Sequence, residues 1–166
     1  MQSKITNRIT EVCKALNNHS VKYLIVGGTA VAFHGYFRWS VDSNGLASEK
    51  FDLDFWYNPT YENYFHLLNA LSDLGQEVGK FKAEKEPKPK SSFFKFEIEN
   101  FTVDFLPTLK GISKFLPSYN KRDIVEIEGV QISFINIDDL LKEKASQSRP
   151  KDLEDIRQLT RKKSER

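Results

Sequence analysis

An apolar run that ends at two glycines limits how this chain can fold: YLIVGGTAVAFHGYFR, residues 23–38. The run predicts a short buried strand over residues 21–26, and a helix is expected over residues 29–37. The pair Gly27-Gly28 permits the tight turn that such a connection needs. Backbone N–H groups at a helix start also favour anions, so the same turn could seat a phosphate. Both interpretations stay open, although the pattern is neither a P-loop nor a dinucleotide fingerprint.

Helix and strand patterns follow one another in a mixed order along the rest of the chain. We expect further helices over residues 3–18, 61–74, 137–147 and 150–161, and strands over 51–57, 93–98, 101–106, 123–127 and 130–135. Tight turns at Glu99-Asn100 and Glu128-Gly129 join the last four strands into two hairpins. The charged, proline-interrupted residues 80–90 predict a mobile loop, and one helical turn is expected around 112–115. This order predicts an α+β fold built around one mixed sheet.

The length of 166 residues suits a single domain. We divide residues 1–166 into an N-terminal helix (1–20), a sheet core (21–135), C-terminal helices (136–161) and a tail (162–166) that is expected to fray. The net charge of +2 identifies no partner. No apolar stretch approaches a membrane span and no signal peptide is recognisable, so we expect a cytoplasmic protein without a membrane partner. The single cysteine, Cys13, excludes an intrachain disulfide and is expected to be a packed thiol.

Acidic residues on two predicted strands are the second strong feature. In FDLDFWY, Asp52 and Asp54 are two positions apart, so their carboxylates point to the same side of the strand. Such close carboxylates repel each other, and Mg²⁺ prefers oxygen ligands of this kind. In FTVDFLP, Asp104 is a third strand carboxylate, costly among apolar neighbours unless it is paired. Three such groups could hold two metal ions about 4 Å apart and support in-line attack at phosphorus. Asp52 and Asp54 alone could equally line a solvent-exposed face.

The order of these features resembles the nucleotidyltransferase superfamily with a DNA polymerase β-like fold. The similarity is greatest to the branch of minimal nucleotidyltransferases and abortive-infection toxins. Its GG-[ST]-A…HG…R segment is matched here by Gly27-Gly28-Thr29-Ala30, His34-Gly35 and Arg38. Its K…R-x-KD-x-x-D segment is matched by Lys144, Arg149-Pro150-Lys151-Asp152 and Asp155. The resemblance extends from residue 21 to about residue 160, and four short motifs in the family's order make it fairly specific.

The resemblance implies a nucleotidyltransferase-like mixed sheet flanked by helices, with a helical C-terminal segment. It implies an enzyme that moves a nucleoside monophosphate from an NTP to an acceptor hydroxyl and releases pyrophosphate. Asp52, Asp54 and Asp104 would be the catalytic and metal-binding residues, for two Mg²⁺ ions with Mn²⁺ as a substitute, and Asp104 could also act as the base. The residues implied to contact the nucleotide are Gly27, Gly28, Thr29, Arg38, Lys144 and Lys151.

Several alternatives remain open on the sequence alone. The acceptor could be an RNA end, a protein or a small molecule, and the toxin branch adds an antitoxin partner. The main alternative is an inactive nucleotide-sensing or partner-binding module of the same fold. His34 is expected to be a packing or helix-end residue, and Arg38 could be a plain surface arginine. The segment Lys144 to Asp152 could be only a solvated helix face. The chain departs from many relatives in the polar residues Val41 to Lys50, which could cover or obstruct the site.

Overall fold

The computed structural model of the chain describes residues 2–35 and 51–165. In chain order its elements are α1 (Gln2–Asn18), β1 (Tyr23–Val26), α2 (Gly27–Phe33), β2 (Phe51–Tyr57), α3 (Tyr61–Asp73), α4 (Gly79–Lys82), the 3-10 turn η1 (Pro89–Ser91), β3 (Phe94–Ile98), β4 (Phe101–Leu106), α5 (Phe115–Asn120), β5 (Asp123–Ile127), β6 (Val130–Phe134), α6 (Ile137–Gln147) and α7 (Pro150–Ser164). Within these described residues, the helices are too short or too polar to cross a lipid bilayer.

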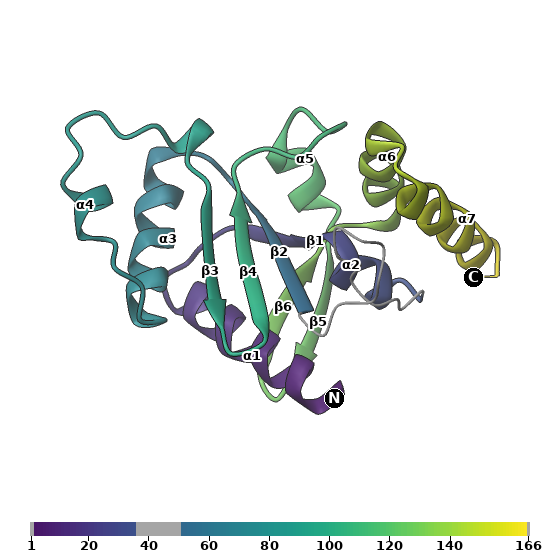
Figure 1. Cartoon of the computed structure of the whole chain (residues 1–166), viewed down its shortest axis with the longest axis horizontal. Helices are drawn as coiled ribbons and strands as arrows, with labels where there is room; N and C mark the ends of the chain where they lie inside the picture. Colours follow the sequence, from purple (N-terminus) through teal and green to yellow (C-terminus); the bar gives the residue numbers. More distant parts are fainter. Residues whose placement is uncertain (1, 36–50, 166) are drawn as a thin grey trace.

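The strands form one six-stranded mixed sheet in the order β3-β4-β2-β1-β6-β5 (Figure 1). At its centre β2 runs parallel to β4 and antiparallel to β1, which in turn runs parallel to β6. The hairpins β3–β4 and β5–β6 supply the two edges of the sheet. The predicted α+β fold, with a mixed sheet flanked by helices and a helical C-terminal segment, is therefore confirmed.

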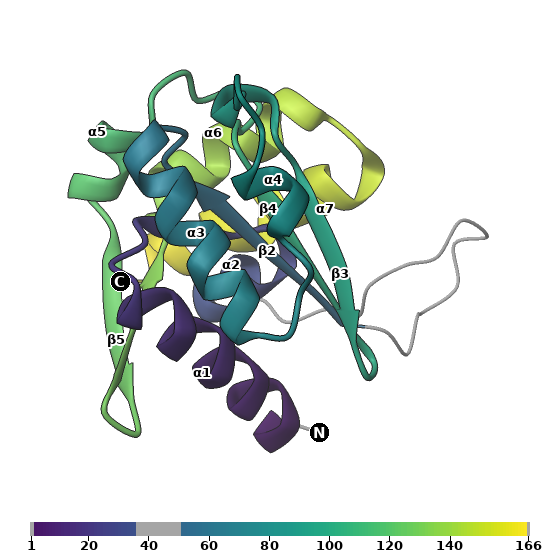
Figure 2. The same cartoon turned by 90° about the vertical axis from the view of Figure 1, so that its left-hand side faces the viewer.

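One face of the sheet carries the aromatic core. Ile25, Phe55, Phe105 and Phe94 lie in register on four neighbouring strands and are all buried. The rings of Phe55 and Phe105 stack with their centroids 4.8 Å apart. Helices α1 and α3 lie over this face (Figure 2), and Tyr64 of α3 brings its ring within 6.0 Å of Phe94, centroid to centroid. Each fully buried Phe contributes roughly 1.5–3 kcal/mol by leaving water, so this face holds the domain together.

The opposite face of the same strands carries charged side chains. The alternation along the strands places Val26, Asp54, Asp104 and Lys95 in one row, on the side away from the aromatic core. Helices α6 and α7 lie behind the sheet as viewed from α1 and α3 (Figure 2). The short α2 packs against β1, β2 and α6. These contacts put the polar row, the Gly-Gly turn and the C-terminal helices around the same region.

Two predictions about segments that connect the strands were wrong. Residues 80–90 are not a loop throughout, since they include most of α4 and most of η1. Pro89 is buried, and its carbonyl accepts a hydrogen bond of 2.9 Å from the Tyr57 hydroxyl. The helix expected near 112–115 instead begins at Phe115, which is buried edge-on against Trp56. In both places a tertiary contact fixes the local structure, which local composition does not reveal.

Two helix boundaries also differ from expectation. The helix after β1 begins at Gly27 itself, where the expected start was Thr29. Helix α7 continues to Ser164, so most of the predicted frayed tail is helical. Its last turn carries Arg161, Lys162 and Lys163, whose positive charges favour the C-terminal end of a helix dipole.

Candidate functional site

A cleft of about 210 Å³ opens on the polar face of the sheet. Its walls come from the β1–α2 turn, β2, β4, the segment after β4, and the region where α6 passes into α7. The lining residues are Val26, Gly27, Gly28, Thr29, Phe51, Asp52, Asp54, Asp104, Leu106, Leu109, Glu143, Lys144, Gln147, Arg149 and Lys151. The cleft thus brings together eight of the nine predicted site residues. The ninth, Arg38, lies outside the described residues, as does the segment Val41 to Lys50.

The acidic side of the cleft is built by two parallel strands. Asp54 of β2 lies directly beside Asp104 of β4 in the strand register, and Asp52 lies beside Thr102. Cβ atoms paired in this way are close enough for their side chains to interact. Asp54 and Asp104 are partly buried, whereas Asp52 is exposed. The strand pairing therefore brings residues 50 positions apart in sequence into direct opposition.

Close burial makes both ionised carboxylates costly. The pKa of Asp54 is raised to about 7, first by burial, then by the charge and hydrogen bond of Asp104 and by the charge of Asp52, while Lys144 acts in the opposite direction. Burial also raises the pKa of Asp104, against the lowering effects of its hydrogen bond to Asp54 and of the Lys95 charge. Asp104 Oδ1 is buried without a hydrogen-bond partner in the described structure. A shared proton or a cation would relieve this repulsion.

The chemistry of these donors fits a hard divalent cation such as Mg²⁺, which takes oxygen ligands. Asp104 Oδ1 has no hydrogen-bond partner in the described structure, and the pKa of Asp54 is raised, so a cation bound between them would stabilise both ionised carboxylates. Among the described residues, however, no three His, Cys, Asp or Glu side chains already stand in metal-binding geometry. Asp52, Asp54 and Asp104 are therefore neighbours on one sheet face and not a fully formed ligand set.

The glycines of the β1–α2 turn differ in what they face. Gly27 has a φ of +68°, and a Cβ atom there would lie 2.4 Å from Asp54 Oδ2. A Cβ on Gly28 would meet nothing within 4 Å. Thr29 is buried, and its hydroxyl donates a 3.3 Å hydrogen bond to the backbone carbonyl of Asp52. The turn is thus seated directly against the carboxylates, and the Thr29 hydroxyl ties α2 to β2.

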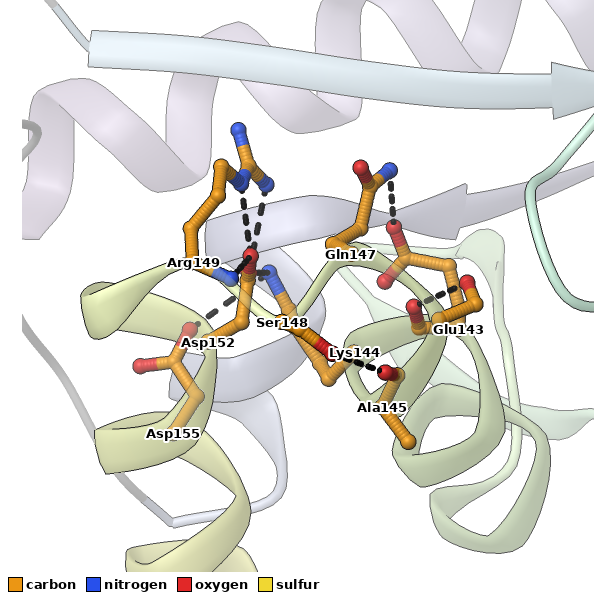
Figure 3. Close-up of polar contacts among 9 residues, drawn as sticks. Glu143, Lys144, Ala145, Gln147, Ser148, Arg149, Asp152 and Asp155 are labelled. Atoms are coloured by element: carbon orange, nitrogen blue, oxygen red, sulfur yellow. Dashed lines mark hydrogen bonds and ion pairs between the residues drawn. The ribbon is translucent and has the colours of Figure 1, made fainter.

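The basic side of the cleft comes from the end of α6 and the start of α7 (Figure 3). Lys144 is buried, and its ammonium nitrogen lies 3.4 Å from both Asp152 Oδ1 and Asp155 Oδ2, which are fully buried. Arg149 is half-exposed and donates from Nε and Nη2 to the Asp152 carboxylate, at 2.6 Å and 3.1 Å. Lys151 is partly buried at the cleft. Lys144 is therefore bound to two internal carboxylates, which the sequence did not reveal.

Sequence reasoning missed three polar residues of the cleft. Arg149 was recognised only as part of a motif, and Glu143 and Gln147 were not singled out. Gln147 Nε2 donates to Glu143 Oε1 at 3.2 Å, and burial raises the pKa of Glu143 against the lowering effects of Lys144 and Gln147. The spacing of Glu143 and Gln147 on α6 is the i, i+4 pattern that places side chains on one helix face. That pattern was the available signal, but it does not reveal that the face lines a cleft.

Two residues expected to be structural are confirmed as such. His34 is buried just after α2, with Nε2 at 2.8 Å from the Ile135 carbonyl oxygen. Cys13 is buried in α1, and desolvation raises the pKa of its thiol to about 12. A thiol held in its protonated form is a poor nucleophile, so neither residue belongs to the candidate site.

A mixed sheet with paired strand carboxylates next to a Gly-Gly turn places the chain in the class of nucleotidyltransferase-like folds. A family model described as "Nucleotidyl transferase of unknown function (DUF2204)" matches residues 5–166, and the chain belongs to this family. The chain also aligns with a crystal structure of an antigenic nucleotidyltransferase-like protein from Paracoccidioides brasiliensis, with a TM-score of 0.48 and 17% sequence identity. That match covers 92% of this chain and 73% of the other. A search of curated proteins gives no match.

Proposed function

We propose that this chain transfers a nucleoside monophosphate from an NTP to an acceptor hydroxyl, with Mg²⁺ or Mn²⁺ bound at its acidic cleft. The observation that carries the proposal is the pairing of Asp54 with Asp104 on adjacent parallel strands, next to Gly27. Membership in a family described as nucleotidyl transferases of unknown function supports this class of reaction. The acidic and basic walls of one cleft suit a substrate that arrives as a metal-bound polyphosphate.

Asp52, Asp54 and Asp104 are the residues that would hold two divalent ions. When bound, such ions neutralise the phosphate oxygens and activate the attacking hydroxyl. The protein contributes neighbouring carboxylates on one sheet face, and a bound cation would relieve the cost of burying them close together. No other set of cleft residues offers comparable oxygen donors from the described part of the chain.

The remaining steps belong to the chain's own groups. The acceptor oxygen attacks the α-phosphorus, the bond between the α-phosphorus and the bridging oxygen breaks, and pyrophosphate leaves. Asp104 would accept the proton of the acceptor hydroxyl, since its buried Oδ1 has no partner in the described structure and its pKa is raised. Gly27 and Gly28 would let the triphosphate approach the carboxylates, because no side chain intervenes there.

A transfer assay tests this proposal directly. Purified protein is incubated with each labelled NTP, with total RNA or lysate protein as the acceptor, with and without Mg²⁺. We expect metal-dependent label transfer and pyrophosphate release, and a loss of roughly 100-fold or more in Asp52→Asn, Asp54→Asn and Asp104→Asn. Asp73→Asn, an exposed carboxylate on α3, is the matched control and should keep full activity. Activity that survives in all three site variants would remove these residues from the mechanism.

A second candidate function is a nucleotide-sensing module that binds but does not transfer. The observation that favours it is that no three metal-ligating side chains of the described residues stand in finished geometry. It predicts Mg²⁺-dependent NTP binding in calorimetry without pyrophosphate release. The nature of the acceptor, an antitoxin partner and a cytoplasmic location remain predictions from the sequence. Co-purification of a second protein, and its effect on transfer, would test the partner.

A further inference from the structure

The junction between α6 and α7 positions the side chain of Arg149 at the cleft, through ion pairs with buried residues. Helix α6 ends at Gln147, and its C-cap residue Ser148 adopts a left-handed conformation with φ of 54°. Its N–H donates to the Lys144 carbonyl at 3.2 Å, and its hydroxyl donates to the Ala145 carbonyl at 2.6 Å. Arg149 is the N-cap residue of α7, and its own backbone N–H donates to Asp152 Oδ2 at 3.1 Å. The backbone on both sides of Arg149 is thus fixed.

The guanidinium of Arg149 is held as firmly as its backbone. Its Nε and Nη2 atoms both donate to Asp152, in the two-pronged geometry that arginine forms with carboxylates. Asp152 is fully buried, and its Oδ1 also forms an ion pair with Lys144 Nζ at 3.4 Å. In Figure 3 the guanidinium extends away from both helices, to the same side as the Gln147 amide. Two of the five N–H groups of this arginine are used by Asp152, so the fork still presents donors.

The two cations of this cluster differ in what surrounds them. Lys144 is 3% exposed and contacts two fully buried carboxylates, so its charge is already offset within the protein. Arg149 is 48% exposed and lines the cleft that Asp54 and Asp104 also line. Both cations are paired with Asp152, but only the Arg149 guanidinium is exposed, so its outer N–H groups can reach an anion while the carboxylate holds the fork in place.

We propose that Arg149 is the residue that grips a phosphate group of the substrate, and that Lys144 is a positioning residue that acts through Asp152. The ligand is a polyphosphate anion, bound by the outer N–H groups of the fork. This inference rests on the proposed function only in identifying that anion as part of a nucleotide. It reassigns to Arg149 a phosphate contact that the family resemblance implied for Lys144 or Lys151.

The test measures binding of inorganic triphosphate and of ATP by calorimetry, at fixed Mg²⁺ concentration. Arg149→Met should weaken the affinity for both ligands by roughly tenfold or more, because the charge-assisted contact between the outer N–H groups of the guanidinium and the phosphate is lost. Arg149→Lys keeps the charge without the fork and should fall between Arg149→Met and wild type. Arg157→Met is the matched control, since Arg157 is an exposed arginine on the same helix, 74% accessible and paired with Glu154. It should bind both ligands as wild type does.

Two outcomes separate this inference from the proposed function. Wild-type affinity for both ligands in Arg149→Met, with normal thermal unfolding, would overturn the role of Arg149 even if nucleotide transfer were demonstrated. Arg149-dependent binding of inorganic triphosphate, without any nucleotide transfer, would support the inference while contradicting the enzymatic proposal. A role for Arg149 that is only structural would lower the unfolding temperature and leave the affinity of the folded protein unchanged.

Discussion

Gly27 and Gly28 are neighbours in sequence with different physical demands. Gly27 combines a positive φ with the closest approach to Asp54, so a side chain there is strained and would also collide with the carboxylate. Gly28 has neither a positive φ nor a nearby atom. The sequence left two interpretations of this pair open, a tight turn and a phosphate-binding position, and the structure suggests a different one for each glycine. Gly27 is required by the turn itself, while Gly28 is the position that leaves room.

A matched pair of alanine substitutions tests this division. We expect Gly27→Ala to lower the free energy of unfolding by roughly 1–3 kcal/mol, because it adds strain at positive φ and displaces Asp54. Gly28→Ala should change stability by less than about 1 kcal/mol, because space is available and helix propensity rises. Urea unfolding monitored by tryptophan fluorescence measures both values. Equal effects of the two substitutions would show that the close approach of Gly27 to Asp54 has no energetic consequence.

The helix pair α6–α7 shows what a sequence pattern can and cannot reveal about a site. The family motif that contains Lys144, Asp152 and Asp155 is a charged cluster in the structure, and Asn136 caps α6 by accepting a 2.9 Å hydrogen bond from the Asp139 N–H. The pattern could not show that the motif folds back on itself, because that depends on the left-handed turn at Ser148. The same residues can form either a buried ion cluster or a solvated helix face, and only the packing of one helix on the other distinguishes the two.

Loss of the buried lysine should affect this helix pair strongly. Lys144→Met removes the buried cation between the fully buried Asp152 and Asp155, while Arg149 stays on Asp152, so we expect a loss of roughly 3–5 kcal/mol in the free energy of unfolding. Lys142→Met is the control on the same helix, since Lys142 is 65% exposed, and its effect should stay below about 1 kcal/mol. Thermal and urea unfolding measure both variants. If Asp155→Asn restores part of the loss in Lys144→Met, uncompensated charge is the cause; no rescue would favour lost packing instead.

Across the whole molecule, local patterns predicted the sheet well and its long-range contacts less well. The strands bearing Asp52, Asp54 and Asp104 alternate apolar and polar residues, so the face that each residue lies on followed directly from the period of two. The facing of Asp54 and Asp104 required the parallel pairing of β2 with β4, and no local pattern in either strand encodes that register. The same limit explains the missed α4 and the shifted α5, which depend on aromatic contacts with distant strands.

The acidic cleft gives the domain an unusual dependence of stability on pH. In the folded, metal-free protein the pKa of Asp54 is about 7, against an ordinary value of 3.8. Between these two values the folded state binds more protons than the unfolded state, so this group makes the free energy of unfolding fall as pH rises. Below about pH 4 the penalty is absent, because Asp54 is protonated in both states. Above about pH 7 the full penalty is present.

Asp54→Asn should remove this penalty and separate stability from activity. In the presence of a chelator we expect the variant to exceed wild type by roughly 1–3 kcal/mol at about pH 8, and to match it near pH 4. Adding Mg²⁺ at the higher pH should stabilise wild type, because a cation bound only by the folded state shifts the unfolding equilibrium, and should stabilise Asp54→Asn much less. Urea titrations at both pH values, with and without Mg²⁺, give the four differences required. The same stability difference at both pH values would mean that burial and the neighbouring carboxylates do not raise the pKa of Asp54 in the folded protein. A cleft that gains stability when its acid is removed, and loses nucleotide transfer at the same time, is one whose carboxylates are kept for binding a cation and not for folding.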